Sequence, residues 1–356
     1  MPERTLRETQ EVTLVKAMRF PAPRRAEIVE VPAPMPAGGE VLVQVKAAGI
    51  CHSDVAAYQG KHTLRCPPVI TGHELAGEVV AIGPAVSRVR SGDRVAVEPH
   101  VGCGRCVYCR SGAYHECPEK RYVGVGDWIG AFAEYVLATE SMCHVIPEAM
   151  SYEEGAALEP CCVGLHAVRL AKLQMGEQVA ILGVGAIGMM TLLAARLAAS
   201  GQIIVSDPSP AKRELARRLG ADVAIDPTAQ EVLQAIRAAT DGEGVDVVFI
   251  CVAKDEVLTQ ALESCRRIGR LVIIASFFQG GPLLAREIQS RERTVIGSSM
   301  YTADDYQLAI RLWHKGRLPL RDLISERISL EEAPDAIAAF ARNAKPDVIK
   351  TVIRFD

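Results

Sequence analysis

The spacing of apolar residues divides the chain into two regions of different texture. Between residues 16 and 100, short apolar runs alternate with polar positions and are cut by Gly and Pro, as in EVLVQVKAAGI and HELAGEVVAIGPAV. Alternation with a period of two is typical of strands that bury one face. This part of the chain therefore predicts a compact β-rich domain.

After Gly176 the pattern changes to strands that alternate with helices. The apolar EQVAILGVGAIG runs into the helical MMTLLAARLAASG, and QIIVSDP is followed by the amphipathic AKRELARRLGA. VDVVFICVA, VLTQALESCRR and GRLVIIASF continue the alternation. Repeated strand–helix–strand units predict a parallel sheet with helices on both faces. Beyond about Leu318, a helix in SLEEAPDAIAAFARN and a strand in VIKTVIRF leave the tail free to rejoin the first domain.

Composition narrows the class of protein. A chain of 356 residues with 23% charged and 49% apolar residues predicts two or three globular domains. A formal net charge of −3 gives no reason to expect nucleic acid or an anionic membrane as partner. The first residues, MPERTLRETQEVTL, contain no apolar core, so we expect neither a signal peptide nor a membrane anchor. A cytoplasmic location follows as an expectation, and thiols stay reduced there.

Four of the eleven cysteines lie close together, in CGRCVYCRSGAYHEC. An odd total and a cytoplasmic location favour a metal site over disulfides. Tetrahedral zinc takes four thiolates, and C-x2-C spacings let one tight turn offer two of them. The sequence therefore predicts a zinc site formed by Cys103, Cys106, Cys109 and Cys117. Four thiolates leave no open coordination position, so this zinc should stiffen a lobe rather than catalyse a reaction.

A glycine-rich motif opens the α/β half. Gly183, Gly185 and Gly188 form G-x-G-x-x-G directly after an apolar strand and before a helix, which is typical of pyrophosphate binding at a helix N-terminus. The next strand ends at Asp207, where a carboxylate can bind the adenosine ribose and repel a 2′-phosphate. NAD is therefore favoured over NADP, with Lys212 as a further ribose contact. The alternative is a tight turn in a Rossmann-like domain that binds another ligand.

Three further motifs carry residues that gain meaning as a set. Cys51 lies in GICHSD, His73 with Glu74 in TGHE, and Glu159 in ALEPCCVG. Taken singly, Cys51 fits a buried small residue, His73 a core histidine and Glu159 a solvated helix position. One thiolate, one imidazole and one carboxylate together form a three-ligand zinc set that leaves a fourth position open. Such a site polarises an alcohol oxygen and suits hydride removal from the carbon.

At this point the chain resembles the zinc-containing medium-chain dehydrogenases, nearest to their sorbitol and polyol dehydrogenase branch. The resemblance extends from about Val15 to Phe355 and is carried by GICHSD, GHELAGEV, GDRVAVEP, the four-cysteine segment, GAFAEYV, LEPCCVGLHAV, GVGAIG and LGADVAID. It implies an α/β fold with a GroES-like catalytic domain over residues 1–170 and 317–356 and a zinc lobe at about 100–118. A Rossmann NAD-binding domain is implied over residues 171–316.

The resemblance also implies roles for single residues. Cys51 and His73 match catalytic zinc ligands, and Glu159 stands at the place of the branch's acidic third ligand. Glu74 matches a nearby acid that can approach or bind the metal. Ser53 matches the hydroxyl that takes the proton of the alcohol, after which hydride passes to the nicotinamide.

Some positions depart from the family pattern. Ala56 stands where many relatives carry a proton-relay histidine, and Ala57 where animal sorbitol dehydrogenases carry a tyrosine. Their substrate-binding arginine falls at Met300, although the adjacent Tyr301 is kept as a candidate catalytic residue. These changes leave room for a secondary alcohol other than sorbitol.

The leading hypothesis is a zinc-dependent oxidoreductase that transfers hydride between a secondary alcohol or polyol and NAD, giving a ketone. A butanediol- or threonine-type dehydrogenase is an alternative. A zinc-free NADPH reductase on this scaffold would lack Cys51, His73 and Asp207, and a non-catalytic binding protein would need a basic face or a broken site. The resemblance implies two zinc ions and NAD per chain, in a homodimer or homotetramer.

Overall fold

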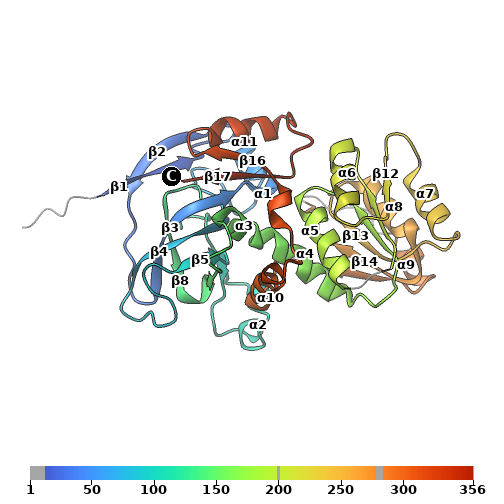
Figure 1. The fold of residues 1–356 in the computed structure, drawn as a ribbon, viewed down its shortest axis with the longest axis horizontal. Coiled ribbons are helices and arrows are strands. Elements are labelled where there is room, and N and C mark those ends of the chain that lie inside the picture. The colour runs from blue at the N-terminus through green and yellow to red at the C-terminus, as the bar shows by residue number, and fades with distance from the viewer. Residues whose placement is uncertain (1–12, 199–200, 278–283, 356) are drawn as a thin grey trace, which may run out of the picture.

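The computed structural model describes residues 13–198, 201–277 and 284–355. These residues form two lobes, each built around one sheet, and the C-terminus lies in the same lobe as the first strands (Figure 1). None of the helices in these ranges is long and apolar enough to cross a lipid bilayer. The arrangement is the GroES-like domain joined to a Rossmann domain that the motifs predict, so the α/β fold class is confirmed.

The first lobe holds a seven-stranded sheet in the order β16-β17-β3-β4-β5-β9, with β8 also paired to β3. Its strands are β3 (Glu40–Gly49), β4 (Glu74–Ile82), β5 (Arg94–Val97), β8 (Tyr135–Thr139), β9 (Cys143–Val145), β16 (Ile324–Ser329) and β17 (Lys350–Arg354). Two small sheets accompany it, β1 (Leu14–Arg19) with β2 (Glu27–Pro32) and β6 (His100–Val101) with β7 (Arg121–Tyr122). The C-terminal strand β17 runs antiparallel to β3, with Val352 opposite Gly49.

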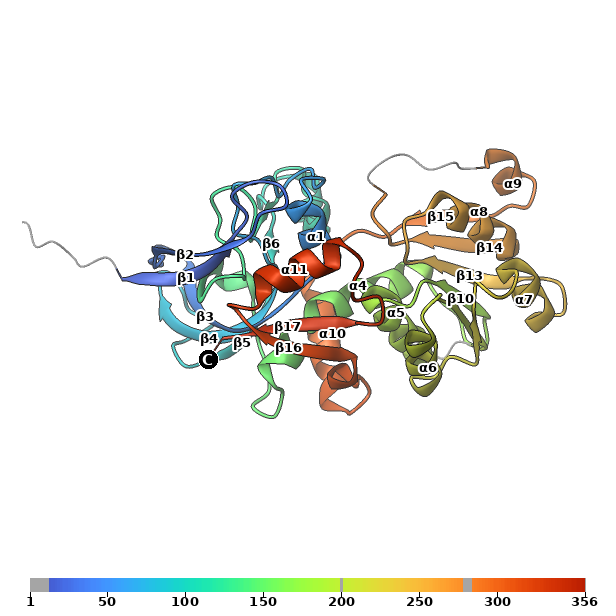
Figure 2. The same cartoon turned by 90° about the horizontal axis from the view of Figure 1, so that it is seen from above.

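The helices of this lobe lie around the sheet and toward the second lobe (Figure 2). They are α1 (His52–Tyr58), α2 (Val107–Arg110), α3 (Tyr152–Ala156), α4 (Leu158–Ala171), α10 (Ala303–His314) and α11 (Ala333–Ala341). Helix α10 packs on α4, and the hydroxyl of Tyr306 donates to the carbonyl of Val97 at 3.1 Å. A helix from the region predicted as Rossmann therefore contacts the first lobe directly.

The second lobe is an all-parallel six-stranded sheet in the order β12-β11-β10-β13-β14-β15. This is the order expected of a doubly wound dinucleotide-binding fold, in which the first three strands are added on one side and the chain then crosses back, so that the fourth strand pairs with the other side of the first. The strands are β10 (Val179–Leu182), β11 (Ile203–Ser206), β12 (Val223–Ile225), β13 (Val245–Ile250), β14 (Cys265–Ile273) and β15 (Thr294–Gly297). The helices are α5 (Ala186–Leu197), α6 (Pro210–Arg218), α7 (Val232–Ala239), α8 (Asp255–Ser264) and α9 (Ala285–Gln289).

The two lobes share one apolar core at the packing of α4 against α5. Buried side chains of α4 such as Leu158 and Leu165 belong to the same cluster as Met189 and Leu192 of α5. Gly164 lets the helices approach closely, because a Cβ at this position would lie 2.6 Å from the backbone carbon of Met190. The relative position of the lobes thus depends on the absence of a side chain at one helical residue.

We predict that Gly164→Val lowers the free energy of unfolding by about 2 kcal/mol or more, since overpacking against backbone cannot be relieved by a side-chain rotation. The measurement is the melting temperature by differential scanning calorimetry. Gly39→Val is the matched control, because no atom lies within 4 Å of an added Cβ there. Equal melting temperatures for the two variants would show that the α4–α5 contact is not tight.

Candidate active site and metal centres

The four clustered cysteines converge in the segment between β6 and β7. All four sulfurs lie within 4.8 Å of one another, and the Sγ atoms of Cys103 and Cys109 are 4.0 Å apart. Tetrahedral zinc with bonds of about 2.3 Å holds its sulfur ligands about 3.8 Å apart. The backbone N–H of Cys103 donates to Cys117 Sγ at 3.3 Å, and that of Cys109 to Cys106 Sγ at 3.4 Å. Because such amides stabilise thiolates, the donor set fits a closed zinc site.

A second donor group lies at the end of the β3–β4 pair. The ligand atoms of Cys51, His73 and Glu74 all lie within 4.8 Å of one another, and His73 and Glu74 are buried. Cys51 is the N-cap of α1, and Glu74 opens β4 opposite Gly49 of β3. A Cβ at Gly49 would lie 1.9 Å from Glu74 Oε2, so this glycine makes room for the carboxylate.

His73 shows why this second group fits a metal. The residue is 6% exposed, and its Nδ1 has no hydrogen-bond partner, although Asp54 Oδ1 lies 3.5 Å away. A buried imidazole that offers a ligand atom within 4.8 Å of those of a thiol and a carboxylate has the chemistry of a metal ligand. Cys51, His73 and one acid leave an open position, which a closed four-thiolate site does not.

Asp54 holds the local geometry of this group. It is fully buried and accepts hydrogen bonds from the backbone N–H of Cys51 at 3.0 Å and the hydroxyl of Thr71 at 2.9 Å. Burial raises the pKa of the Asp54 carboxyl, but His73 and the donors around it outweigh burial and hold the pKa well below its usual range. Asp54 therefore stays ionised and fixes Cys51 relative to His73.

Glu159 lies apart from the three-residue donor group. It sits in the first turn of α4 and is 7% exposed, and its Oε1 accepts a hydrogen bond from the hydroxyl of Tyr301. Burial raises the pKa of the Glu159 carboxyl, while His73 lowers it and Glu74 raises it, so the carboxylate lies near enough to interact with both. Tyr301 is itself fully buried. In this structure Tyr301 orients Glu159.

The sequence reasoning did not single out Lys350, which pairs with Glu74. The Nζ of Lys350 lies 2.7 Å from each carboxylate oxygen of Glu74 and donates to the carbonyl of Ile50 at 3.2 Å. Burial lowers the pKa of Lys350, but the Glu74 carboxylate outweighs it and the pKa is raised. A lone lysine inside the apolar strand VIKTVIRF was the available signal, because a charged residue in a central strand needs a partner.

The glycine-rich loop has the geometry that a dinucleotide needs. Gly183 has φ +89°, and a Cβ at Gly188 would lie 2.0 Å from the carbonyl oxygen of Gly183. Gly185 is the N-cap of α5 and has nothing within 4 Å of an added Cβ, so the helix N-terminus is open to a pyrophosphate. Asp207 follows β11, and its two carboxylate oxygens accept from the N–H of Val184 at 3.0 Å and of Ser209 at 2.9 Å.

Lys212 and Ser53 both lie in hydrogen-bonded positions. Lys212 is half-buried in the first turn of α6, where its backbone N–H donates to Ser209 Oγ at 3.1 Å. Ser53 Oγ accepts a hydrogen bond from Arg65 at 3.3 Å.

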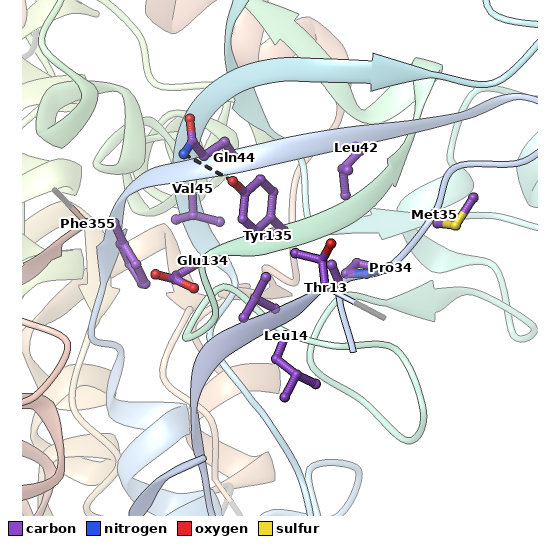
Figure 3. A pocket seen from close by; sticks show the side chains of 12 residues that line it. Thr13, Leu14, Pro34, Met35, Leu42, Gln44, Val45, Glu134, Tyr135 and Phe355 are labelled. Atoms are coloured by element: carbon purple, nitrogen blue, oxygen red, sulfur yellow. Dashed lines mark hydrogen bonds between the residues drawn. The ribbon is translucent and has the colours of Figure 1, made fainter. Parts of the chain in front are cut away.

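A cavity of about 410 Å³ opens elsewhere, between β1 and β8, with Leu14, Tyr135 and Phe355 on its wall (Figure 3). None of the predicted zinc, proton-transfer or cofactor residues lines it.

We predict that Lys350→Met lowers the free energy of unfolding by about 3–5 kcal/mol, because it leaves the buried Glu74 carboxylate without a counter-charge. Adding Glu74→Gln to this variant should recover most of the loss. Lys345→Met is the matched control, since its pair with Glu326 is about 30% exposed on both sides and should be worth less than about 1 kcal/mol. Calorimetry that gave equal losses for the two lysine variants would contradict a buried pair.

Comparisons with known proteins agree with this geometry. Residues 37–148 match the family model of the alcohol dehydrogenase GroES-like domain, and residues 186–315 match that of the zinc-binding dehydrogenases. The chain is 36% identical over 335 residues to the sorbitol dehydrogenase of Bacillus subtilis (strain 168), an alignment that covers 93% of this chain and 94% of that protein. It is 38% identical over 255 residues to the L-threonine 3-dehydrogenase of Pyrococcus horikoshii, covering 71% of this chain and 73% of the relative.

A solved structure is similar over nearly the whole length. A zinc-binding dehydrogenase from Sinorhizobium meliloti 1021, bound to NADP, matches with a TM-score of 0.90 at 34% identity and covers 96% of this chain and 100% of that one. The two family models, the order of the strands and an alignment that covers nearly the whole chain all indicate one family. The chain belongs to the zinc-containing medium-chain dehydrogenase family.

Proposed function

We propose that this protein is a zinc-dependent, NAD-linked dehydrogenase that oxidises a secondary alcohol or polyol to a ketone. The observation that carries the proposal is the group of Cys51, His73 and Glu74, which offers a thiolate, an imidazole and a carboxylate within 4.8 Å of one another. A catalytic zinc site of this family needs three such ligands and an open position. Ser53, two residues from Cys51, supplies the candidate hydroxyl for proton transfer.

The residues of the chain divide the work as follows. Zinc held by Cys51 and His73, with Glu74 or Glu159 as the acidic ligand, would supply a Lewis acid that lowers the pKa of an alcohol. Ser53 receives the proton of the alcohol at Oγ and passes its own proton outward. Ala56 is 4% exposed and packs in the core, so we propose that this outward path uses water or a cofactor hydroxyl.

The loop after β10 and the strand end at β11 would hold the cofactor. The N-terminus of α5 at Gly185 would bind the pyrophosphate, and Asp207 would accept hydrogen bonds from the ribose hydroxyls. Asp207 already accepts hydrogen bonds from two backbone N–H groups, so its carboxylate is held in place. A fixed negative charge at this place opposes a 2′-phosphate, which supports NAD over NADP.

The alternatives differ in what they ask of the site. A butanediol- or threonine-type dehydrogenase would use the same ligands and differ only in the residues that bind the rest of the substrate. A zinc-free NADPH reductase has no use for a thiol, an imidazole and a carboxylate gathered at one place. The cytoplasmic location and the homodimer or homotetramer stay predictions.

We predict about two zinc ions per chain, measured by inductively coupled plasma mass spectrometry on the purified protein. Cys51→Ser should lose one zinc and reduce kcat by about 10³-fold or more, because the Lewis acid is lost, while NADH still binds. Cys106→Ser is the control: it should also lose one zinc and lower the melting temperature, because the closed site has a structural role. Full turnover by Cys51→Ser would reject the proposed catalytic site.

We also predict that kcat/KM with NAD⁺ exceeds that with NADP⁺. In Asp207→Ala the ratio of the two values should fall roughly 10- to 100-fold, the worth of a hydrogen bond to a charged group. Glu214→Ala, an exposed change on α6, the helix that follows Asp207, serves as control and should leave the ratio unaltered. A wild-type preference for NADP⁺, or an unaltered ratio in Asp207→Ala, would remove the assigned role of Asp207.

A further inference from the structure

A tyrosine of the four-cysteine lobe reaches out of that lobe to the start of α10. Tyr114 begins the short 3-10 helix η1 (Tyr114–Glu116), which leads directly into Cys117. The carbonyl of Tyr114 accepts a hydrogen bond from the backbone N–H of Cys117 at 3.0 Å. A Cβ at Gly102 would lie 3.1 Å from the Cβ of Tyr114, so the chain passes close by on the other side as well. The backbone of Tyr114 is therefore held by the same turns that present the cysteines.

The hydroxyl of Tyr114 makes two hydrogen bonds outside the lobe. It donates to Glu98 Oε1 at 2.7 Å and accepts from the backbone N–H of Ala303 at 2.5 Å. Ala303 is the first residue of α10, and Glu98 directly follows β5 and is 1% exposed. Burial and the Glu98 carboxylate raise the pKa of Tyr114 well above its usual range, so the phenol keeps the proton that it donates. One side chain thus joins the four-cysteine lobe to the N-terminus of α10.

Tyr301 links this contact to the acid near the metal site. It lies two residues before Ala303, it is fully buried, and its hydroxyl donates to Glu159 Oε1. The ring of His100 stacks on that of Tyr114 with centroids 5.6 Å apart, and it meets the ring of Tyr301 edge-on at 5.6 Å. Because protein interiors are close-packed, a shift of Tyr114 would be transmitted through this ring to Tyr301.

The rest of α10 is held independently of Tyr114. Gln307 Nε2 lies 3.2 Å from His144 Nδ1, and the hydroxyl of Tyr306 donates to the carbonyl of Val97 at 3.1 Å. Loss of the Tyr114 hydroxyl should therefore release the first turn of α10 and the residues before it, while the helix stays attached to the first lobe.

We propose that Tyr114 is a positioning residue for the dehydrogenase reaction, because it holds the start of α10 where Tyr301 can orient Glu159. The proposal rests on the proposed function and adds a residue that acts through Tyr301 rather than on the substrate. Groups that take part in catalysis must stay within about 0.5 Å of the productive geometry, so a small shift of the donor to Glu159 reduces turnover. The four-cysteine lobe thereby has a route to the active site that its thiolates alone would not provide.

Tyr114→Phe tests the hydroxyl alone, because phenylalanine keeps the ring that stacks on His100. We would measure kcat of the zinc-loaded enzyme with NAD⁺ and whichever of sorbitol, 2,3-butanediol and L-threonine it oxidises fastest. In Tyr114→Phe kcat should fall about 10-fold, while the zinc content stays at the wild-type value. Tyr108→Phe is the matched control: Tyr108 lies in the same lobe and is 46% exposed, so kcat should not change.

A double-mutant cycle separates positioning from a general loss of stability. Tyr301→Phe removes the donor to Glu159 and should lower kcat by itself. If Tyr114 acts through Tyr301, adding Tyr114→Phe to Tyr301→Phe lowers kcat by less than about 2-fold further, because the contact that it positions is already lost. A merely structural role predicts that the two losses multiply. Multiplied losses in the double variant, or a kcat of Tyr114→Phe equal to that of the wild type, would overturn the proposal.

Hydrogen exchange followed by mass spectrometry gives a readout that needs no turnover. In Tyr114→Phe the N–H of Ala303 loses its acceptor, so peptides that cover residues 300–305 should exchange about 10-fold faster, while those of β17 keep the wild-type rate. Equal exchange at residues 300–305 in both proteins would reject the contact, whatever the activity. A wild type that oxidises none of the three alcohols, together with faster exchange in Tyr114→Phe, would count against the proposed function and support the contact.

Discussion

The buried pair of Glu74 and Lys350 is the interaction on which the site depends. Glu74 is the first residue of β4, and Lys350 is the first residue of the last strand, β17. Their contact, with the further hydrogen bond from Lys350 to the carbonyl of Ile50, ties three segments together directly beside Cys51. Each charge makes burial of the other less costly, because an unpaired charge at this depth would have to be exposed to water or neutralised by a change in protonation. Glu74 is therefore paired with its counter-charge only when the C-terminal strand β17 has added to the sheet beside β3.

Strand register explains how residues distant in the sequence meet. Gly49, the last residue of β3, pairs with Glu74 on one side and with Val352 on the other. Cys51 and the start of β4 therefore lie at the same end of these antiparallel strands. The second lobe then joins through α4, which carries Glu159 in its first turn and packs against α5 of the Rossmann sheet. One helix thus connects an acid near the metal site with the helix whose N-terminus faces the cofactor.

The sequence predicted the features that are local or repeated. The strand–helix alternation and the spacing of Gly183, Gly185 and Gly188 were enough for the Rossmann half, because each glycine acts within a few residues of itself. The four cysteines were predicted as a group for the same reason. Cys51, His73 and Glu159 were joined only by the chemistry of a ligand set, and the structure gathers Glu74 rather than Glu159 with the first two. Lys350, Arg65 and the contact of Tyr301 with Glu159 depend on tertiary pairing, and no periodicity or spacing carries that information.

Cys51, His73 and Glu74 are proposed to surround a metal ion, with Glu74 held in place by Lys350 and Cys51 by Asp54. A crystal structure with anomalous scattering recorded on both sides of the zinc absorption edge tests it most directly. We predict two zinc peaks per chain, one among the four cysteines and one in contact with Cys51 Sγ and the His73 ring. A single peak confined to the four-cysteine lobe would contradict it.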